Sequence, residues 1–358
     1  MIKEYTALGL MSGTSGDGVD ASIVKSDGSD NYKVILNKYF KYSLDISNGI
    51  YELKEKINNS QDLTTLNLEL NSIEEKITLF HAESAKSLLL DNNVDVVGFH
   101  GQTIYHNPKE KISKQLGNGK LLSDILKKDI IYNFRKNDLE NNGEGAPLTP
   151  IFHKLILQKK KIDLPVSILN LGGIANITTV YKDSMSSSDI GPANCLIDKW
   201  IKINANKYFD KDGKISSKGS INKIILDQAL DNYYNNDVSK LKSYDTKDFD
   251  LSFVRGLSLE DGAATLTEYT AEILSQRMKN HKIYLSGGGR KNKYLINRIK
   301  NKTKNNVHLI DEIDIDGDFI ESQAFAFLAI RSLLNLPISF PETTGCSKPT
   351  VGGELIKY

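Results

Sequence analysis

Two apolar segments of this sequence each lead into a glycine-rich turn followed by a second extended segment, once in each half of the chain. In the first half the turn lies within GLMSGTSGDGVD, from Gly9 to Asp20. In the second half it lies within LNLGGIANIT, from Leu169 to Thr178. Helical and strand patterns alternate elsewhere, which indicates an α/β protein. The repeated strand–turn–strand unit therefore predicts two similar α/β domains with a cleft between them.

The length of 358 residues is enough for two domains that each bury a core. We predict an N-terminal domain over residues 1–158 and a C-terminal domain over residues 159–358. One long helix, or a helix with a break, is expected over residues 62–91 because its apolar residues follow three-and-four spacing. The C-terminal tail, from Pro337, is rich in proline and glycine and is expected to be irregular.

Charge and cysteine content exclude several classes of protein. The net charge is +1, whereas a dedicated nucleic-acid binder carries a basic excess. Two cysteines, Cys195 and Cys346, provide neither a disulfide framework nor a zinc cluster, which favours a reducing compartment. The N-terminus shows no signal-peptide pattern, and no apolar stretch is long enough to cross a bilayer. We therefore expect a cytoplasmic protein that binds neither nucleic acid nor membrane.

The first glycine turn has the composition of an anion site. Its glycines allow positive φ and close approach of a ligand, and its backbone N–H groups and hydroxyls can donate to phosphate oxygens. Asp17 and Asp20 are candidates to hold Mg²⁺, because hard cations prefer carboxylate oxygens. A simple hairpin turn with polar side chains explains the segment equally well. The turn is not a Walker A loop, since GxxxxGK[ST] does not occur in the chain.

Two further glycine turns lie in the second half. Gly172 and Gly173 follow an apolar strand, as the first turn does. The segment LSGGGRKN, from Leu285 to Asn292, passes from a strand through three glycines into a helix, a geometry suited to a nucleotide. A tight strand–helix loop is the structural alternative. The GxGxxG spacing of a dinucleotide fold is missing.

Two polar segments offer acid–base chemistry. In DIGPAN, Asp189 precedes Gly-Pro, so a turn is expected to hold its carboxylate rigidly, as a general base requires. The alternative is a turn in which Asp189 only satisfies its own backbone. His100 opens the polar segment HGQT, which we expect to be a loop after a buried strand over residues 94–99. The histidines show no metal-binding spacing, and no GxSxG elbow is present.

The ordered motifs identify a family. GLMSGTSGDGVD, GFHGQT, NFRKND followed by GEGAPLTPIFH, LNLGGIANIT, DIGPAN, SGGGRKN and ESQAFAFLA together resemble the anhydro-N-acetylmuramic acid kinases, members of the sugar kinase–Hsp70–actin superfamily. The resemblance covers nearly the whole chain. It implies two α/β domains with mixed sheets flanked by helices and an active-site cleft between them. It also implies that ATP and water convert 1,6-anhydro-N-acetylmuramic acid to N-acetylmuramic acid 6-phosphate, in peptidoglycan recycling.

The resemblance also assigns roles to residues. Asp189 matches the acid that activates the attacking water, and Arg135 and Glu321 match residues of the sugar pocket, to which we add His100. Asp17 and Asp20 are the predicted Mg²⁺ ligands. The residues assigned to ATP are Gly13, Thr14, Ser15, Gly16, Asp17, Gly18, Val19, Asp20, Gly172, Gly173, Gly287, Gly288 and Gly289.

The chain departs from the family pattern at several positions. Ile190 and Ala193 stand where the family usually has Thr and Gly, Gly16 replaces a leucine, and Asn133 replaces an aspartate. These departures leave open a related kinase with a different sugar or small hydroxylated substrate. A non-catalytic sensor of ATP or muropeptides is a further alternative, although it would not need the retained acids. A homodimer is left open.

Overall fold

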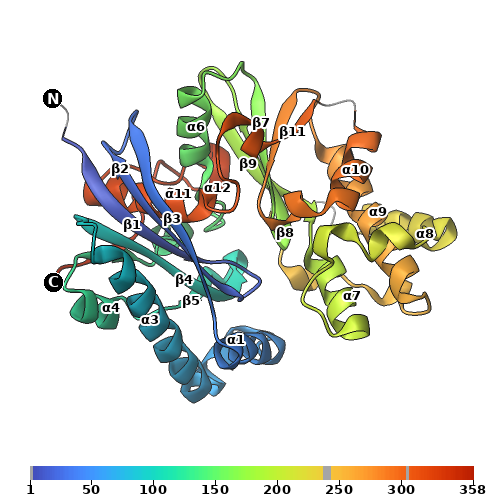
Figure 1. Cartoon of the computed structure of the whole chain (residues 1–358), viewed down its shortest axis with the longest axis horizontal. Coiled ribbons are helices and arrows are strands. Elements are labelled where there is room, and N and C mark those ends of the chain that lie inside the picture. The colour runs from blue at the N-terminus through green and yellow to red at the C-terminus, as the bar shows by residue number, and fades with distance from the viewer. Residues whose placement is uncertain (1–2, 237–242, 304–305) are drawn as a thin grey trace. The chain divides into compact units, whose positions relative to one another are not determined.

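The computed structural model describes residues 3–236, 243–303 and 306–358, which form two compact units (Figure 1). Unit 1 comprises Met1–Lys161 and Phe319–Tyr358, and unit 2 comprises Ile162–Asp318. The first crossing between units is close to the division placed at residue 158. The C-terminal segment, however, returns to unit 1, because the long apolar helix after Phe319 packs on the first sheet.

Unit 1 is built around a mixed sheet with the strand order β12-β6-β4-β1-β2-β3, and β5 pairs with β4. Strands β1, β4 and β6 are parallel to one another, whereas β2 and β3 run antiparallel in a meander from β1. Its strands are β1 (Tyr5–Ser12), β2 (Gly18–Ser26), β3 (Tyr32–Lys41), β4 (Val96–Asn107), β5 (Ile112–Leu116), β6 (Ile130–Tyr132) and β12 (Glu354–Ile356). Its helices are α1 (Leu44–Lys56), α2 (Ser60–Thr65), α3 (Asn67–Leu89), α4 (Gly119–Leu126), α5 (Lys136–Glu140), α6 (Pro150–Lys159), α11 (Ile320–Leu333) and α12 (Pro341–Thr344).

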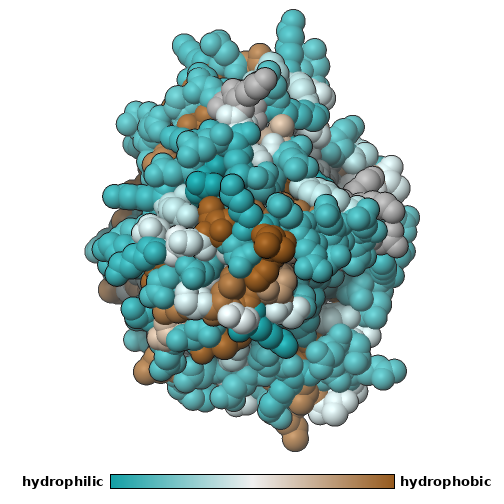
Figure 2. All heavy atoms as spheres, turned by 90° about the vertical axis from the view of Figure 1, so that its right-hand side faces the viewer, coloured by the Kyte–Doolittle hydropathy of each residue, from teal (hydrophilic) through white to brown (hydrophobic). Residues whose placement is uncertain are grey.

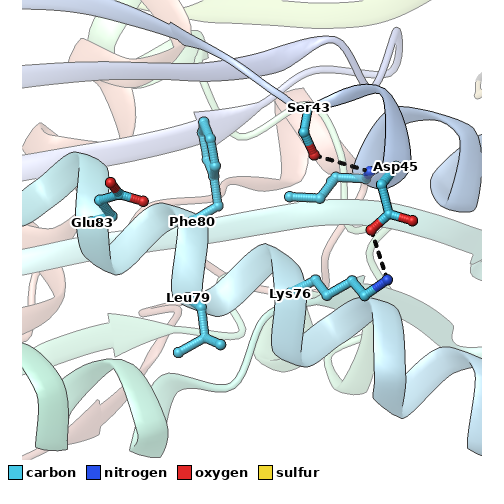
Figure 3. A pocket seen from close by; sticks show the side chains of 7 residues that line it. Ser43, Asp45, Lys76, Leu79, Phe80 and Glu83 are labelled. Atoms are coloured by element: carbon cyan, nitrogen blue, oxygen red, sulfur yellow. Dashed lines mark hydrogen bonds and ion pairs between the residues drawn. The ribbon is translucent and has the colours of Figure 1, made fainter.

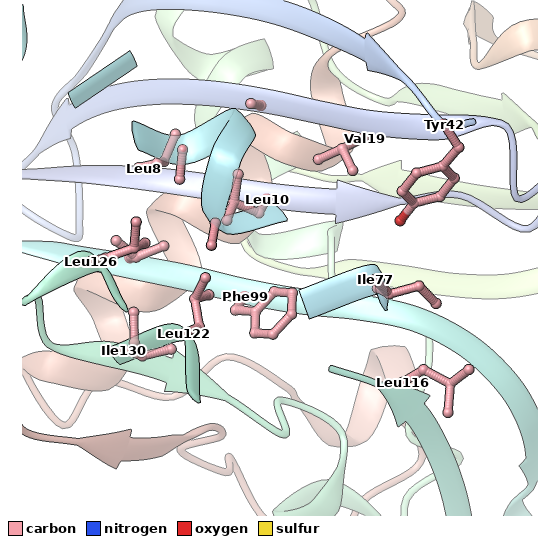
Figure 4. Close-up of a cluster of buried hydrophobic side chains, with 14 of the residues drawn as sticks. Leu8, Leu10, Val19, Tyr42, Ile77, Phe99, Leu116, Leu122, Leu126 and Ile130 are labelled. Atoms are coloured by element: carbon pink, nitrogen blue, oxygen red, sulfur yellow. The ribbon is translucent and has the colours of Figure 1, made fainter. Parts of the chain in front are cut away.

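The two faces of this sheet are covered by different helices. Alternate residues of β1, β2 and β4 point into an apolar cluster with α1 and α3, including Leu10, Val19 and Phe99 (Figure 4). The opposite face carries α11, which approaches so closely that a Cβ on Gly9 would lie 2.0 Å from the Ser322 carbonyl oxygen. Side chains of β1, β2 and β4 that point away from the apolar cluster therefore lie on the α11 face.

Unit 2 repeats this arrangement with the strand order β11-β10-β7-β8-β9. Its strands are β7 (Val166–Leu171), β8 (Ile174–Val180), β9 (Met185–Pro192), β10 (Lys282–Ser286) and β11 (Val307–Leu309). Its helices are α7 (Cys195–Ala205), α8 (Lys223–Asn235), α9 (Leu259–Arg277) and α10 (Lys293–Lys302). Helices α9 and α10 cover one face through an apolar cluster that includes Leu171, Leu274 and Leu295.

The two sheets share one topology. In each, an antiparallel meander of three strands is followed by helices and by two strands parallel to the first. The strands β1, β2, β3, β4 and β6 thus correspond to β7, β8, β9, β10 and β11. The predicted α/β fold of two similar halves with mixed sheets and flanking helices is confirmed.

Three local predictions are corrected. HGQT is not a loop, because β4 continues to Asn107 and pairs there with β5. Asp189 is not in a turn but within β9. The tail is not wholly irregular, since it contains α12 and the edge strand β12. The predicted break in the helix over residues 62–91 does occur, at Leu66 between α2 and α3.

Within residues 3–236, 243–303 and 306–358, none of the helices combines the length and apolar character needed to span a bilayer.

Candidate active site

The first glycine turn closes the β1–β2 hairpin of unit 1. The Gly16 N–H donates to the Gly13 carbonyl at 3.1 Å, so residues 13–16 form a β-turn. Gly16 has φ +64°, a conformation that glycine adopts without strain. Gly18 is required for space, because an added Cβ would lie 2.4 Å from the Phe40 carbonyl oxygen. The predicted turn is therefore fixed by glycine geometry at two positions.

Two carbonyl groups of this turn accept hydrogen bonds from side chains of unit 1. Gly13 O accepts from Gln102 Nε2 at 3.0 Å and Thr14 O accepts from Lys54 Nζ at 2.7 Å. In a trans peptide the N–H of the following residue points the opposite way. The N–H groups of Thr14 and Ser15 are consequently directed away from these partners, and both residues are exposed. Outward N–H groups of this kind favour an anion-binding turn over a purely structural hairpin.

The two candidate magnesium ligands differ in position. Asp17 is exposed in the turn and accepts from the Ser15 hydroxyl. Asp20 is partly buried in β2 between Val19 and Ala21, which point into the apolar cluster, so it lies on the α11 face. Burial, together with the charges of these aspartates, raises the pKa of the neighbouring Tyr39.

In the described residues no three His, Cys, Asp or Glu side chains converge in a way that would enclose a metal ion. Asp17 and Asp20 carry carboxylate oxygens, which are ligands that Mg²⁺ prefers.

His100, within β4, forms a hydrogen-bonded pair with Arg135, which follows the neighbouring strand β6. His100 is only 4% exposed. Its Nδ1 lies 2.9 Å from the Gly101 carbonyl oxygen, which can only accept, so Nδ1 carries the proton. Its Nε2 then accepts from Arg135 Nη2 at 3.0 Å and from Nε at 3.3 Å. Burial and the Arg135 charge hold the pKa of His100 well below 6.5, which keeps Nε2 an acceptor.

Glu321 lies in the first turn of α11, the helix that also contacts His100 through Phe325 with ring centroids 4.4 Å apart. Burial raises the pKa of Glu321, and the nearby Arg135 charge opposes that rise. Arg135 is thus in electrostatic contact with Glu321 and in hydrogen-bond contact with His100. The three residues predicted for the sugar come together within unit 1.

In unit 2, Asp189 lies at one end of a polar row across three strands, on the edge strand β9. Its cross-strand neighbour in β8 is Asn176, whose own neighbour in β7 is Asn170, so the three side chains share one face. The Tyr244 N–H donates to Asp189 Oδ2 at 2.9 Å. Asp189 is therefore oriented by a backbone donor from a distant segment. The Tyr244 N–H, and not a local turn, therefore holds the carboxylate in place.

The two unusual residues of DIGPAN point away from this polar row. Ile190 is 3% exposed and Ala193 is fully buried, and both belong to the apolar cluster with α9 and α10. An isoleucine fills this environment without a hydroxyl that would need a partner. The departures from the family pattern are therefore accommodated in the core and leave the surroundings of Asp189 polar.

The remaining glycine turns meet at the carboxyl ends of the parallel strands β7 and β10. Asn194 holds the turn at Gly172 in place, because its N–H and its Nδ2 both donate to the Gly172 carbonyl, at 3.0 and 2.8 Å. Gly287 has φ +76°, and an added Cβ there would lie 2.3 Å from Asn170 Oδ1. By contrast, a Cβ on Gly288 would have no atom within 4 Å. Gly288 is thus open for the approach of a ligand.

Sequence analysis missed the residues that hold these turns. Arg290 is 6% exposed, donates to the Gly287 carbonyl at 3.1 Å and pairs with Asp311 and Asp318 at 2.8 and 2.6 Å. Asn194 and Gln102 anchor the other turns. All three lie inside the quoted motifs, but their partners are far away in the sequence, so motif position was the only available signal.

A pocket on the other face of unit 1 is lined by residues of α1 and α3 and of the turn before α1 (Figure 3). Its Lys76 Nζ pairs with Asp45 Oδ2 at 2.7 Å, and Ser43 caps α1. These polar groups thus stabilise α1 and its packing on α3, and we assign no function to the pocket.

Duplicated α/β units, each with a glycine turn where a parallel strand ends, define a class of enzymes that handle phosphate groups. The family model for anhydro-N-acetylmuramic acid kinase matches residues 5–357. An anhydro-N-acetylmuramic acid kinase of Pelagibacter ubique (strain HTCC1062) is 51% identical over the full length of both chains. One of Zymomonas mobilis is 36% identical, with 98% of this chain and 99% of the relative covered. The chain belongs to the anhydro-N-acetylmuramic acid kinase family.

This membership confirms the predicted resemblance, the kinase class and the amino-sugar type of substrate; peptidoglycan recycling is the context of the family's activity. Among solved structures, an activator of 2-hydroxyisocaproyl-CoA dehydratase from Clostridium difficile is 11% identical with a TM-score of 0.42, covering 92% of this chain and 96% of that one. A ROK family glucokinase from Streptomyces griseus is 10% identical with a TM-score of 0.40, covering 90% and 99%. Both likenesses are remote and do not indicate what this chain binds.

Proposed function

We propose that this chain uses ATP and water to convert 1,6-anhydro-N-acetylmuramic acid to N-acetylmuramic acid 6-phosphate. The observation that carries the proposal at the level of residues is the group His100, Arg135 and Glu321 on the α11 side of unit 1. A fixed guanidinium beside a half-buried carboxylate suits a substrate with both a lactyl carboxylate and hydroxyl groups. Arg135 offers donors to the former, and Glu321 offers acceptors to the latter.

Asp189 is the general base in this proposal. Its carboxylate removes a proton from water, and the water oxygen bonds to the anomeric carbon while the bond from that carbon to O6 breaks. The released O6 then attacks the γ-phosphorus of ATP, and ADP leaves. The Tyr244 N–H on Asp189 Oδ2 supports this role, since it orients the carboxylate.

ATP is assigned to the glycine turns of both units. The outward N–H groups at Thr14 and Ser15 would donate to phosphate oxygens, and the turns at Gly172 and Gly287 would serve the rest of the nucleotide. Mg²⁺ would neutralise charge on the phosphates when bound, with Asp17 and Asp20 as the carboxylates available to it.

The test of this proposal is an assay of purified protein with ATP, Mg²⁺ and the anhydro-sugar, followed by mass analysis of the product. The expected product carries one added water and one added phosphoryl group. Turnover of other sugars with none of this one would indicate the alternative, a superfamily kinase with another substrate. Binding of both ligands without phosphate transfer would indicate a sensor.

A His100→Phe substitution tests the sugar side. Phenylalanine keeps the ring beside Phe325 but removes the acceptor for Arg135, so the guanidinium loses its orientation. We expect KM for the sugar to rise about tenfold, the value of one lost charge-assisted hydrogen bond, with KM for ATP within a factor of about two. His100→Gln restores an acceptor and should recover part of the loss. Equal effects on both substrates would contradict the role.

The cellular location and the assembly are also proposals. ATP as the phosphoryl donor supports a cytoplasmic enzyme. Figure 2 shows apolar side chains exposed within a hydrophilic face. The large apolar residues that unit 2 exposes include Ile203, Phe209 and Ile224, with Ile224 82% exposed. Such residues support a homodimer, which a measurement of mass by light scattering would detect.

A further inference from the structure

Gln102, in β4, is fully buried and holds the first glycine turn from below. Its Nε2 lies 3.0 Å from the Gly13 carbonyl oxygen and 3.3 Å from that of Thr103. Both neighbours can only accept, so the amide nitrogen must face them and the orientation of the side chain is fixed. Gln102 thus bonds the turn directly from β4, the strand that runs parallel to β1 beside it.

The other end of this amide is left without a partner. Gln102 Oε1 is buried and accepts no hydrogen bond within the described part of the chain. A buried acceptor left unsatisfied costs about 1–3 kcal/mol, which an apolar side chain of similar shape would avoid. The packing of the core therefore does not explain why residue 102 is a glutamine. The bond from Nε2 to the turn gives a better explanation.

A β-bulge in β4 places the side chains of residues 100 and 102 on opposite faces of the sheet. Leu10 pairs with Phe99, but the next residue, Met11, pairs with Gly101, and Gly101 has φ +73°. The extra residue places His100 on the α11 face and Gln102 on the other face, opposite Ser12. Without the bulge, residues 100 and 102 would share a face.

We propose that Gln102 is a positioning residue that fixes the phosphate-binding turn relative to the strand that carries His100. The bulged segment of β4 then sets both the position of the turn, through Gln102, and the orientation of Arg135, through His100. The inference rests on the proposed role of the turn in binding ATP, and it adds a residue that acts on nucleotide without touching it.

The test compares Gln102→Met with Gln115→Met in steady-state assays that vary ATP and sugar separately. Methionine matches glutamine in size but cannot donate. Gln115 lies in the adjacent strand β5 and bonds Ser113 at 2.7 Å and the Thr103 hydroxyl at 3.3 Å, but in the described part of the chain it makes no hydrogen bond to the turn, so it is the matched control. We expect KM for ATP to rise about tenfold in Gln102→Met, with KM for sugar within a factor of about two. Gln115→Met should match wild type.

Gln102→Glu gives a signature in pH. A protonated carboxyl group can donate to Gly13 O, whereas an ionised one cannot. The ATP defect of Gln102→Glu, relative to wild type at the same pH, should therefore shrink as the pH falls. This variant also keeps the proposal testable if Gln102→Met does not fold. An ATP defect that is independent of pH, or equal defects for both substrates, would overturn the inference.

Thr14→Pro separates this inference from the proposed function. Proline is well tolerated at the second position of a β-turn, and it removes the N–H aimed at the phosphates. If Thr14→Pro leaves KM for ATP unchanged, the assignment of the turn to ATP is wrong. If Thr14→Pro impairs ATP use but Gln102→Met does not, only the role of Gln102 is wrong.

Discussion

Asp189→Asn is expected to lower kcat by about 10²–10⁴-fold, the usual contribution of a general base, while the affinity for ATP stays within a factor of about two. An amide cannot take the proton from the attacking water. It can still accept the Tyr244 N–H through its Oδ1, so the 2.9 Å contact that orients the side chain survives. Turnover would be measured with the anhydro-sugar, and nucleotide affinity with a non-hydrolysable ATP analogue.

The matched control for this variant is Asp183→Asn, which makes the same change at an exposed position between β8 and β9. It should leave both kcat and nucleotide affinity at wild-type levels. A kcat for Asp189→Asn within about tenfold of wild type would be inconsistent with base catalysis by Asp189. A large loss of nucleotide affinity would instead point to a role in holding the substrates.

The sequence predicted the fold well where a local pattern was sufficient. The glycine turns followed by strands indicated the duplicated α/β units, and the apolar periodicity located α3. The return of α11 to unit 1 was not predictable in the same way, because an apolar helix can pack on either sheet. Only the close approach allowed by Gly9 and Gly98 shows which sheet receives it.

The candidate site was less accessible, because its geometry depends on contacts between distant segments. His100 was predicted to bind sugar, but in the structure both of its ring nitrogens bond within unit 1, to Gly101 and Arg135. Its proposed role is therefore to orient Arg135. Asp189 was expected in a turn because Gly-Pro follows it. The pairing of β9 with β8 overrides that local preference, since Gly191 and Pro192 can occupy the end of an edge strand.

Glu321→Gln is expected to reduce kcat/KM for the sugar by about tenfold to a hundredfold and to leave the melting temperature no lower than that of wild type. The reduction follows from the loss of charge-assisted hydrogen bonds to substrate hydroxyls, worth about 1.5–3 kcal/mol. The effect on stability follows from burial, which raises the pKa of Glu321 above its ordinary 4.5 despite the Arg135 charge. The fold thus disfavours the ionised form.

The sign of the pH dependence makes this prediction specific. A carboxyl group whose pKa is raised by folding destabilises the protein as the pH rises from about 4.5 through the folded pKa, because only the unfolded chain ionises freely. Thermal melts should show this loss in wild type and lack it in Glu321→Gln. Glu354→Gln is a control with a shift of the opposite sign, since Lys136 and Asn133 lower the pKa of Glu354 despite its partial burial. A lower melting temperature in Glu321→Gln with unchanged sugar kinetics would mean that Glu321 only supports the fold.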